Sequence, residues 1–222
     1  MAPQPGVFIT LEGGEGSGKS TVAAYLAGRL RAEGRDVLLT EEPGGTELGQ
    51  HFWAYLRDPS RPPLAPLAEL FLFEAARTQH VEQVLRPALA RGVIVVCDRF
   101  SDSSVAYQGH GRELGPDLVE MLNAAATSGL DPHLTLLLDL PVADGLGRAR
   151  ALEGDGAAKA ADAIGAETAA FHERVRAGFQ EIAGQEPTRV VTIDASAPLA
   201  AVKEAAWSEV SRVLQRMAPA SG

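Results

Sequence analysis

The sequence predicts an α/β fold, a five-stranded parallel sheet flanked by helices. Five short runs are rich in leucine or β-branched residues and almost continuously apolar, as strands covered on both faces are. They lie at residues 7–12, 36–40, 93–97, 134–139 and 190–194. Segments with helical spacing separate these runs, and parallel strands require such crossover connections.

Three helical patterns fill the gaps between the strands. The first follows Lys19 and places Val22, Leu26 and Leu30 on one stripe. The second predicts a longer helix at about 66–90, with its apolar stripe formed by Leu67, Leu70, Phe71, Val81, Val84 and Leu85. The third resumes late in the chain with Phe171, Val175 and Phe179. The strand and helix patterns therefore alternate along the chain.

Acidic residues stand where the predicted strands end. In open parallel sheets, ligands bind beyond the carboxyl ends of the strands. The acidic residues at these ends are Glu12, Glu41, Glu42, Asp98, Asp139 and Asp194. We expect the functional site at this edge of the sheet.

Composition limits the class of protein. The 222 residues are 45% hydrophobic, which predicts one compact domain over 1–222. The net charge of −9 argues against a nucleic-acid surface, which normally carries a basic patch. Segment 1–6 has no signal-like stretch, and no apolar run approaches the roughly 20 residues that cross a bilayer. With Cys97 as the single cysteine, we expect a cytoplasmic protein without an intrachain disulfide or a membrane partner.

Two segments are predicted to be irregular. The Gly- and Ala-rich stretch EGDGAAKAADAIGAE (153–167) indicates a mobile loop, because the helical pattern resumes after it. Residues 218–222 are predicted to be a frayed tail.

The stretch GGEGSGKS (13–20), here called the phosphate loop, matches the spacing G-x-x-x-x-G-K-[ST]. Glycines allow backbone N–H groups to surround phosphates, Lys19 neutralises charge, and the Ser20 hydroxyl can coordinate Mg²⁺. The alternative is a flexible turn with an exposed lysine, which the strand before and the helix after make less favourable. We expect ATP to bind through Gly13, Gly14, Glu15, Gly16, Ser17, Gly18, Lys19, Ser20 and Thr21.

Three classes of nucleotide-binding protein compete. A GTPase is expected to carry Asn-Lys-x-Asp, but none of the three lysines follows an asparagine. A large ATPase machine usually needs a longer chain. A small phosphotransferase remains, with its acceptor opposite the phosphate loop.

Two further stretches favour the phosphotransferase. Asp98 ends a strand and could hold Mg²⁺ directly or through water, and Arg99 could grip an acceptor phosphate. The alternative for this pair is a surface ion pair. Phe73 and Arg77 share a helix face and offer a ring for a base and a guanidinium for a phosphate. Taken alone, Phe73 is more typical of a core residue.

Together these motifs resemble the thymidylate kinases, P-loop nucleoside monophosphate kinases that transfer the γ-phosphoryl group of ATP to dTMP. The resemblance covers nearly the whole chain in order. The matching stretches are FITLEGGEGSGKST, EEPGGTELG, FLFEAAR, CDRF…AYQGHGR, DPHLTLLLDLP and VVTIDAS. It implies a bacterial-type enzyme of dTTP biosynthesis with ATP as donor and Mg²⁺ as cofactor, and a homodimer packed through long helices.

The resemblance also implies roles for individual residues. Catalysis is assigned to Lys19, Asp98, Arg99 and Arg150, and the metal to Ser20 and Asp98. Arg148 and Arg150 begin a lid over ATP, at about 151–167. Acceptor binding is assigned to Glu12 near the sugar, Phe73 on the thymine ring, Arg77 and Arg99 on the phosphate, Ser103 and Ser104 at the base with Gln108 nearby, and Tyr107 against the sugar face.

The chain departs from the family pattern at its lid. Where bacterial members carry an Asp-Arg-x-Glu-like stretch, this chain has Asp162-Ala163-Ile164-Gly165, and the only Lys or Arg between Arg150 and Arg174 is Lys159. Three alternatives compete: Arg148 or Arg150 suffices, Lys159 acts instead, or the enzyme is slow. We favour an arginine, because its guanidinium clamps a phosphate at two points and lysine cannot.

Two more positions differ from the family. Glu41 stands where an arginine usually precedes Glu-Pro-Gly-Gly, and it is left without a role. Trp53 also replaces a common arginine and is interpreted as a helix packing residue.

Two other functions stay open for this chain. One is a kinase for another deoxynucleotide or a deoxynucleoside, and the other is a catalytically weak, regulatory nucleotide-binding homologue.

Overall fold

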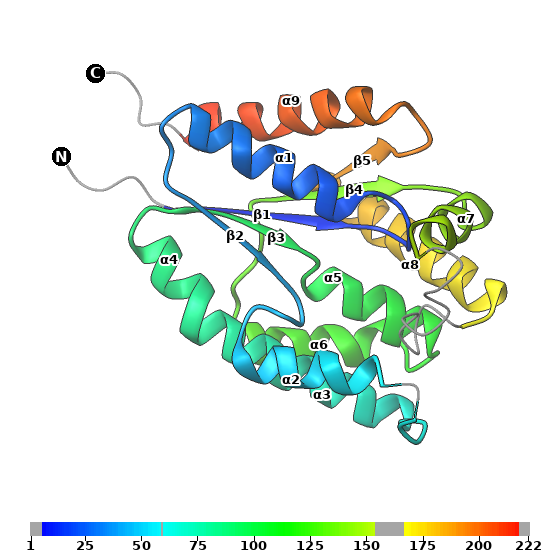
Figure 1. Ribbon diagram of the computed structural model, residues 1–222. Coiled ribbons are helices and arrows are strands. Elements are labelled where there is room, and N and C mark those ends of the chain that lie inside the picture. The colour runs from blue at the N-terminus through cyan, green and yellow to red at the C-terminus, as the bar shows by residue number, and fades with distance from the viewer. Residues whose placement is uncertain (1–5, 59, 154–166, 218–222) are drawn as a thin grey trace.

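The computed structural model describes residues 6–58, 60–153 and 167–217. It confirms the predicted five-stranded parallel sheet, in the strand order β2-β3-β1-β4-β5 (Figure 1). The strands are β1 (Val7–Glu12), β2 (Val37–Glu41), β3 (Ile94–Asp98), β4 (Leu134–Asp139) and β5 (Val190–Asp194). The predicted strands differ from these by at most one residue at an end.

Helices connect successive strands, as parallel pairing requires. The phosphate loop leads from β1 directly into α1 (Lys19–Ala32), and a connection of several helices joins β2 to β3. The remaining segments are α2 (Glu47–Leu56), α3 (Pro66–His80), the π-helical η1 (Val81–Leu85), α4 (Arg86–Ala90), α5 (Ser101–Ser104), the π-helical η2 (Val105–Gly111), α6 (Pro116–Thr127), α7 (Val142–Glu153), α8 (Ala169–Gln185) and α9 (Leu199–Met217).

Side chains alternate across the sheet, so each face has its own core. Helices α1 and α9 lie side by side over one face in Figure 1, and residues such as Ile9 and Leu136 pack against them. The opposite face presents Phe8, Val95 and Leu137 to helices that include α4 and α8. Because both faces are covered, the strands are apolar almost throughout.

The predicted long helix is present over residues 66–90 as α3, η1 and α4. Its predicted single apolar stripe is wrong in part. Leu70, Val81 and Leu85 are buried, but Leu67 and Phe71 are 40% and 52% exposed. Leu67 and Phe71 are four residues apart and share an exposed side of α3, next to the side that buries Leu70, Glu74 and Arg77.

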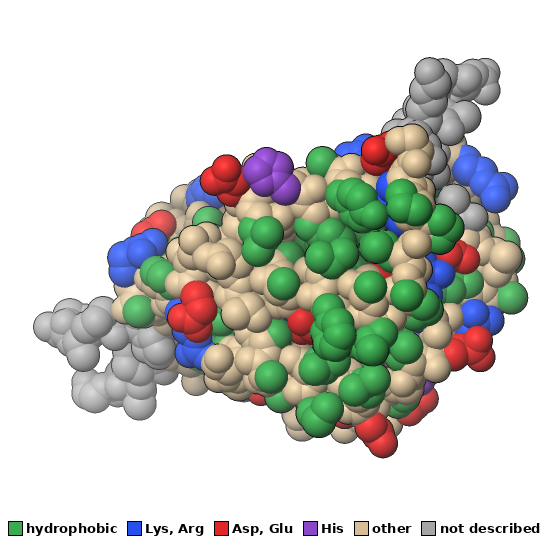
Figure 2. All heavy atoms as spheres, turned by 90° about the horizontal axis from the view of Figure 1, so that it is seen from below, with side chains coloured by type: hydrophobic (Ala, Val, Ile, Leu, Met, Phe, Trp, Pro, Cys, Tyr) green, Lys and Arg blue, Asp and Glu red, His purple; other side chains and the backbone are tan. Residues whose placement is uncertain are grey.

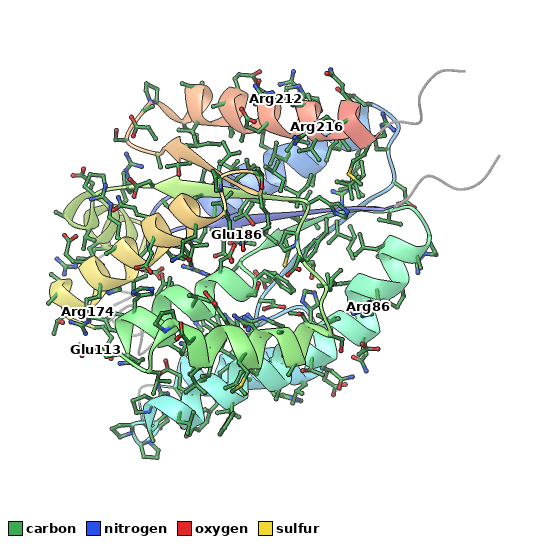
Figure 3. All side chains as sticks on the ribbon, turned by 180° about the vertical axis from the view of Figure 1, so that it is seen from behind. Arg86, Glu113, Arg174, Glu186, Arg212 and Arg216 are labelled. Carbon is green, nitrogen blue, oxygen red and sulfur yellow. The ribbon has the colours of Figure 1, made fainter. Side chains whose placement is uncertain are left out.

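Helix α8 supports η2, the segment that contains the predicted site residues Tyr107 and Gln108. It packs against η2 through the apolar side chains Phe171 and Val175. The Arg174 guanidinium donates to the Gly111 carbonyl at 2.8 Å and lies near Glu113, as Figure 3 shows from behind. The position of η2 is therefore fixed from the side of the sheet opposite α1.

Parts of the chain lie outside this description. Of the predicted lid at 151–167, residues 154–166 are outside the described residues, and so is the predicted tail at 218–222. Within the described residues, no helix combines the length and the apolar composition needed to span a bilayer.

Candidate active site

The phosphate loop wraps around the amino end of α1. Gly13, Gly16 and Gly18 have φ angles of 137°, 65° and 93°, which side chains with a Cβ rarely adopt. A Cβ on Gly16 would lie 2.2 Å from the Gly145 carbonyl oxygen of α7, so the loop and α7 are in backbone contact. This tight turn aims the free N–H groups of the first turn of α1 at one point, where an anion is favoured.

Lys19 lies inside the loop. Its Nζ donates to the carbonyl oxygens of Gly13 and Gly14 at 3.1 and 2.8 Å. Burial and the positive charge of Arg99 lower the pKa of Lys19 to about 8, although nearby carboxylates oppose this shift. A polyanion in the loop would therefore be a favourable partner for the ammonium group.

Ser20 and Asp98 bring two hard oxygen ligands together beside the loop. The Ser20 hydroxyl donates to Oδ2 of Asp98 at 2.5 Å. Among the described residues, no group of three or more His, Cys, Asp or Glu side chains is arranged to hold a metal. The pair fits Mg²⁺, which keeps several waters and is usually held by one or two protein groups together with substrate phosphates.

Arg99 follows β3 in a left-handed conformation, with φ 69°. This conformation is costly for a residue with a side chain and points to a local demand on its position. Its guanidinium donates to the Gly13 carbonyl, the Ser103 and Tyr107 hydroxyls and the Glu15 carboxylate, at 3.0 to 3.2 Å. The phosphate loop and η2 are therefore connected through one arginine.

Glu15 is the carboxylate of the phosphate loop. Burial alone would raise its pKa, but the charges of Arg99 and Lys19 outweigh burial and lower the pKa to about 2. The Tyr107 hydroxyl also donates to it at 2.8 Å. Glu15 is thus a stable anion between the loop lysine and Arg99.

Glu12 ends β1 and is 1% exposed. It accepts hydrogen bonds from the Phe100 backbone N–H at 2.8 Å and from the Ser103 hydroxyl at 2.6 Å. Burial, followed by the negative charge of Asp102, raises its pKa to about 8. Its carboxyl group thus helps to hold the turn after β3.

A cavity of about 410 Å³ opens in front of the loop. This volume is within the range of small-molecule sites. The lining includes six of the nine predicted loop residues, without Gly13, Gly14 and Ser17, and seven of the eight predicted acceptor residues, without Glu12. It comprises Glu15, Gly16, Gly18, Lys19, Ser20, Thr21, Glu41, Glu42, Pro43, Gly44, Trp53, Phe73, Arg77, Asp98, Arg99, Phe100, Ser103, Ser104, Tyr107 and Gln108.

Phe73 is both a core packing residue and a lining residue of the cavity, so both interpretations of it are compatible with the structure. Its ring packs edge-on against Phe52 at a centroid distance of 4.9 Å, and it also lines the cavity. Trp53 packs in the same apolar cluster with Phe52, as a helix packing residue would, and it lines the cavity as well. An aromatic wall therefore faces the phosphate loop.

Arg77 is buried below this wall, with its side chain 1% exposed. All five of its N–H groups have acceptors in the protein, so binding a phosphate would require exchange of one of them. The acceptors are Glu42 at 2.9 Å, Glu74 and Asn123 at 2.7 Å each, the Phe100 carbonyl at 3.2 Å and the Ser104 hydroxyl at 3.0 Å. Sequence reasoning missed this network, because all of its members except Glu74 lie far from Arg77 in the chain.

The two predicted lid arginines lie outside the lining of the cavity. Arg148 on α7 donates to the Ala195 carbonyl at 3.0 Å, next to the end of β5. Arg150 is exposed on the same helix. Both therefore belong to α7, which contacts the phosphate loop at Gly16, and not to the wall of the larger cavity.

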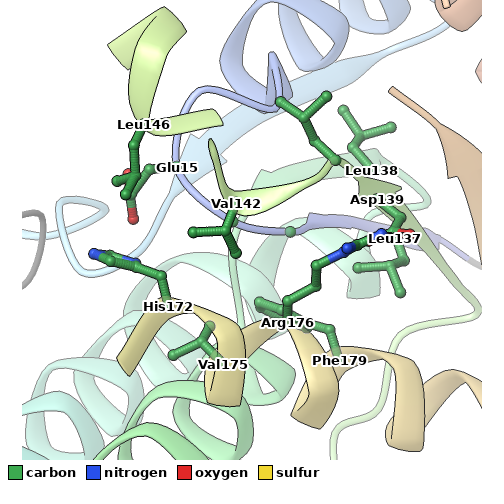
Figure 4. Close-up of a pocket in the computed structure, with 13 residues that line it drawn as sticks. Glu15, Leu137, Leu138, Asp139, Val142, Leu146, His172, Val175, Arg176 and Phe179 are labelled. Atoms are coloured by element: carbon green, nitrogen blue, oxygen red, sulfur yellow. Dashed lines mark hydrogen bonds and ion pairs between the residues drawn. The ribbon is translucent and has the colours of Figure 1, made fainter. Parts of the chain in front are cut away.

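A second, smaller cavity of about 20 Å³ lies behind the loop, large enough for about one water. Figure 4 shows Glu15 and His172 on one side of it and the ion pair of Arg176 with Asp139 on the other. His172 also lowers the pKa of Glu15. The predicted strand-end residue Asp139 thus supports α8 and does not line the larger cavity.

Comparisons with known proteins identify the family of this chain. The sequence profile of the thymidylate kinase family matches residues 11–206. A thymidylate kinase of Desulfovibrio desulfuricans is 52% identical, over 86% of this chain and 89% of the relative. One of Synechococcus sp. is 50% identical, over 92% and 94%. The crystal structure of thymidylate kinase from Ehrlichia chaffeensis superposes with a TM-score of 0.72 at 32% identity, covering 93% of this chain and 99% of that one. The chain belongs to the thymidylate kinase family.

Proposed function

We propose that this protein transfers the γ-phosphoryl group of ATP to dTMP and so produces dTDP for dTTP synthesis. The observation that carries the proposal is that the residues assigned to the donor and those assigned to the acceptor line the same cavity. Lys19 and Ser20 line it from the phosphate loop, and Phe73 and Tyr107 line it from the opposite side. Such an arrangement brings two anions together, which is the main task in phosphoryl transfer.

On the donor side, the ATP phosphates occupy the phosphate loop. Backbone N–H groups at the start of α1 and the Lys19 ammonium bind them. Ser20 and Asp98 would hold a Mg²⁺ ion, which would supply positive charge against the phosphate oxygens. Thr21 follows Ser20 in α1 and also lines the cavity.

On the acceptor side, Arg99 is the residue best placed to bind the dTMP phosphate. It lies between the loop and η2, and its side chain is 21% exposed. Phe73 offers its ring to the base, and Tyr107 faces the sugar, with Ser103, Ser104 and Gln108 beside it. Arg77 keeps its proposed role at the acceptor phosphate only through exchange of one of its five protein acceptors.

We assign to Arg150 the positive charge that would otherwise come from an arginine within the lid. Arg148 already donates to Ala195. Arg150 lies two residues further along α7 and is exposed. This helix is the last one that the structure describes before residues 154–166. A guanidinium there can bind phosphate oxygens at two points.

We propose that the protein acts as a homodimer. Figure 2 looks onto the face formed by α2, α3 and α6, where apolar side chains gather. The large exposed apolar residues on these helices are Leu48, Tyr55, Leu67, Phe71, Leu72 and Met121. Apolar patches of this kind mark interaction surfaces, and a second copy of this chain would cover the patch.

A cytoplasmic location fits ATP as substrate and the buried free thiol of Cys97.

A coupled ADP-release assay tests the proposal. ATP and Mg²⁺ are offered with dTMP, dUMP, UMP, dCMP or thymidine, and Lys19→Ala is the matched control. We expect the highest kcat/KM with dTMP and its loss in the control variant. A preference for another deoxynucleotide would establish the second kind of kinase. ATP binding without turnover of any acceptor would favour the regulatory homologue.

A further inference from the structure

The amide group of Gln108 has a fixed orientation in the acceptor cavity. Gln108 lies in η2, is 1% exposed and lines the cavity. Its Nε2 donates to Oε1 of Glu69 at 2.9 Å. Glu69 belongs to α3 and does not line the cavity, so this contact approaches Gln108 from behind.

Glu69 is itself held by an arginine. The carboxylate is 2% exposed and accepts from Arg112 at both oxygens, Nε to Oε1 at 3.2 Å and Nη2 to Oε2 at 3.0 Å. Arg112 also pairs with Glu167 and lies over the Phe171 ring, with 4.9 Å from its Cζ to the ring centroid. Both oxygens of Glu69 are thus occupied as acceptors by the Arg112 guanidinium, and a carboxylate held in this way presents only acceptors to Gln108.

This pairing decides which end of the Gln108 amide faces the ligand. Because Glu69 can only accept, the Nε2 end must face it, and the carbonyl oxygen Oε1 points the other way. Among the described residues, no donor contacts Oε1. A carbonyl oxygen presented to a base selects an edge that carries an N–H group.

We propose that Glu69 and Arg112 are positioning residues that set the base preference of this enzyme through the orientation of Gln108. The inference rests on the proposed function. Thymine and uracil carry a hydrogen at N3, whereas cytosine has a lone pair there that would face the Gln108 oxygen. Neither Glu69 nor Arg112 touches the nucleotide, and their effect is on the amide alone.

The test is the ratio of kcat/KM for dTMP to that for dCMP in Glu69→Gln. The new side chain can donate as well as accept, so the Gln108 amide is free to turn over. We expect the ratio to fall about tenfold, mainly through a higher KM for dTMP and a lower KM for dCMP, with a smaller change in kcat. Glu167→Gln is the matched control, because Glu167 binds the same Arg112 but not Gln108; its ratio stays within about twofold of wild type.

A double-mutant cycle separates positioning from a general structural effect. In a Gln108→Leu background, Glu69→Gln is expected to change the ratio no further, because the amide that it orients is absent. If Glu69→Gln does not fold, Arg112→Lys replaces it. Lysine keeps the charge but loses the two-point contact that fixes the Glu69 carboxylate against Gln108, so the ratio is expected to fall in the same direction.

Three results would overturn the inference. They are an unchanged ratio in a folded Glu69→Gln or Arg112→Lys variant, an equal fall in Glu167→Gln, and an equal effect of Glu69→Gln with or without Gln108. A wild-type protein without dTMP turnover would instead overturn the proposed function. The two failures are therefore distinguishable.

Discussion

The hydroxyl of Ser20 and the carboxylate of Asp98 are joined by a 2.5 Å hydrogen bond, although the two residues are 78 positions apart in the chain. Ser20 stands at the start of α1, and Asp98 ends β3, the strand that pairs with β1. The parallel register thus places a strand-end carboxylate against the first turn of the helix that follows the neighbouring strand. Under the proposed function, this pair would hold Mg²⁺ beside the triphosphate.

Asp98→Asn is expected to lower kcat about 100-fold and to raise the Mg²⁺ concentration needed for half-maximal rate, because the amide is a weaker metal ligand and carries no charge. Steady-state rates over a Mg²⁺ titration measure both effects. Asp194→Asn is the matched control, since Asp194 also ends a strand but bonds to Ser196. Wild-type Mg²⁺ dependence in Asp98→Asn would remove Asp98 from the metal site.

ATP affinity is expected to decline as the pH rises through about 8. The pKa of Lys19 in the free protein is lowered to about 8, so the ammonium that binds the phosphates is present below this pH and lost above it. Bound phosphates favour the charged form, and binding near pH 8 therefore takes up protons. Calorimetry with a non-hydrolysable ATP analogue between pH 7.5 and 9.5 measures both effects.

Lys19→Arg is the control for this pH dependence, because arginine stays charged over the whole range. Its affinity profile is expected to be flat. A flat wild-type profile would contradict the low pKa of Lys19.

Glu12 is expected to make the folded protein less stable as the pH rises. Its folded pKa is raised to about 8 from an ordinary 4.5, so between these values the folded state binds a proton that the unfolded state releases. The stability advantage is complete below about 4.5 and is lost as the pH rises through 8. Relative to wild type, Glu12→Gln should therefore gain roughly 5 °C in Tm between pH 5 and pH 9. A constant difference in Tm across this range would show that Glu12 is ionised in the folded state.

The lid arginine is tested by comparing two cations. Arg150→Ala is expected to lower kcat at least tenfold, because it removes the guanidinium assigned to the ATP phosphates. Lys159→Ala is expected to leave kcat within about twofold. Single-turnover rates of both variants with ATP and dTMP measure this difference. An intact rate in Arg150→Ala with loss in Lys159→Ala would transfer the role to the lysine.

The proposed dimer surface is tested by placing a charge on it. Phe71→Glu places a carboxylate on a side chain that is 52% exposed on α3, and it should convert a dimer into a monomer in sedimentation experiments. Leu199→Glu is the matched control, because Leu199 is 48% exposed on α9 at the other face of the sheet. A wild-type monomer, or a Phe71→Glu dimer, would place the interface elsewhere or exclude it.

Most of the fold could be predicted from local patterns. A strand covered on both faces is apolar throughout, and the spacing of the phosphate loop is fixed by backbone geometry, so both are visible in a few consecutive residues. The strand-end rule also identified Asp98 and Glu12 as neighbours of the loop. It failed to separate them from Asp139, whose carboxylate pairs with Arg176.

The contacts between distant segments could not be predicted. Arg77 looked like a ligand for phosphate, but its burial depends on Glu42, Asn123 and the Phe100 carbonyl, which come from three other segments. The pair of Glu69 with Gln108 is also invisible in the sequence, since 39 residues separate them. Such networks depend on three-dimensional packing, which periodicity and spacing do not encode.

Transfer of the labelled γ-phosphoryl group from ATP to dTMP tests the central claim most directly. The protein is incubated with γ-labelled ATP, Mg²⁺ and dTMP, and the products are separated. The account predicts label at the β-position of dTDP, formed in equal amount to ADP and absent with Lys19→Ala. Label released as inorganic phosphate, or retained in ATP while dTMP is unchanged, would contradict it.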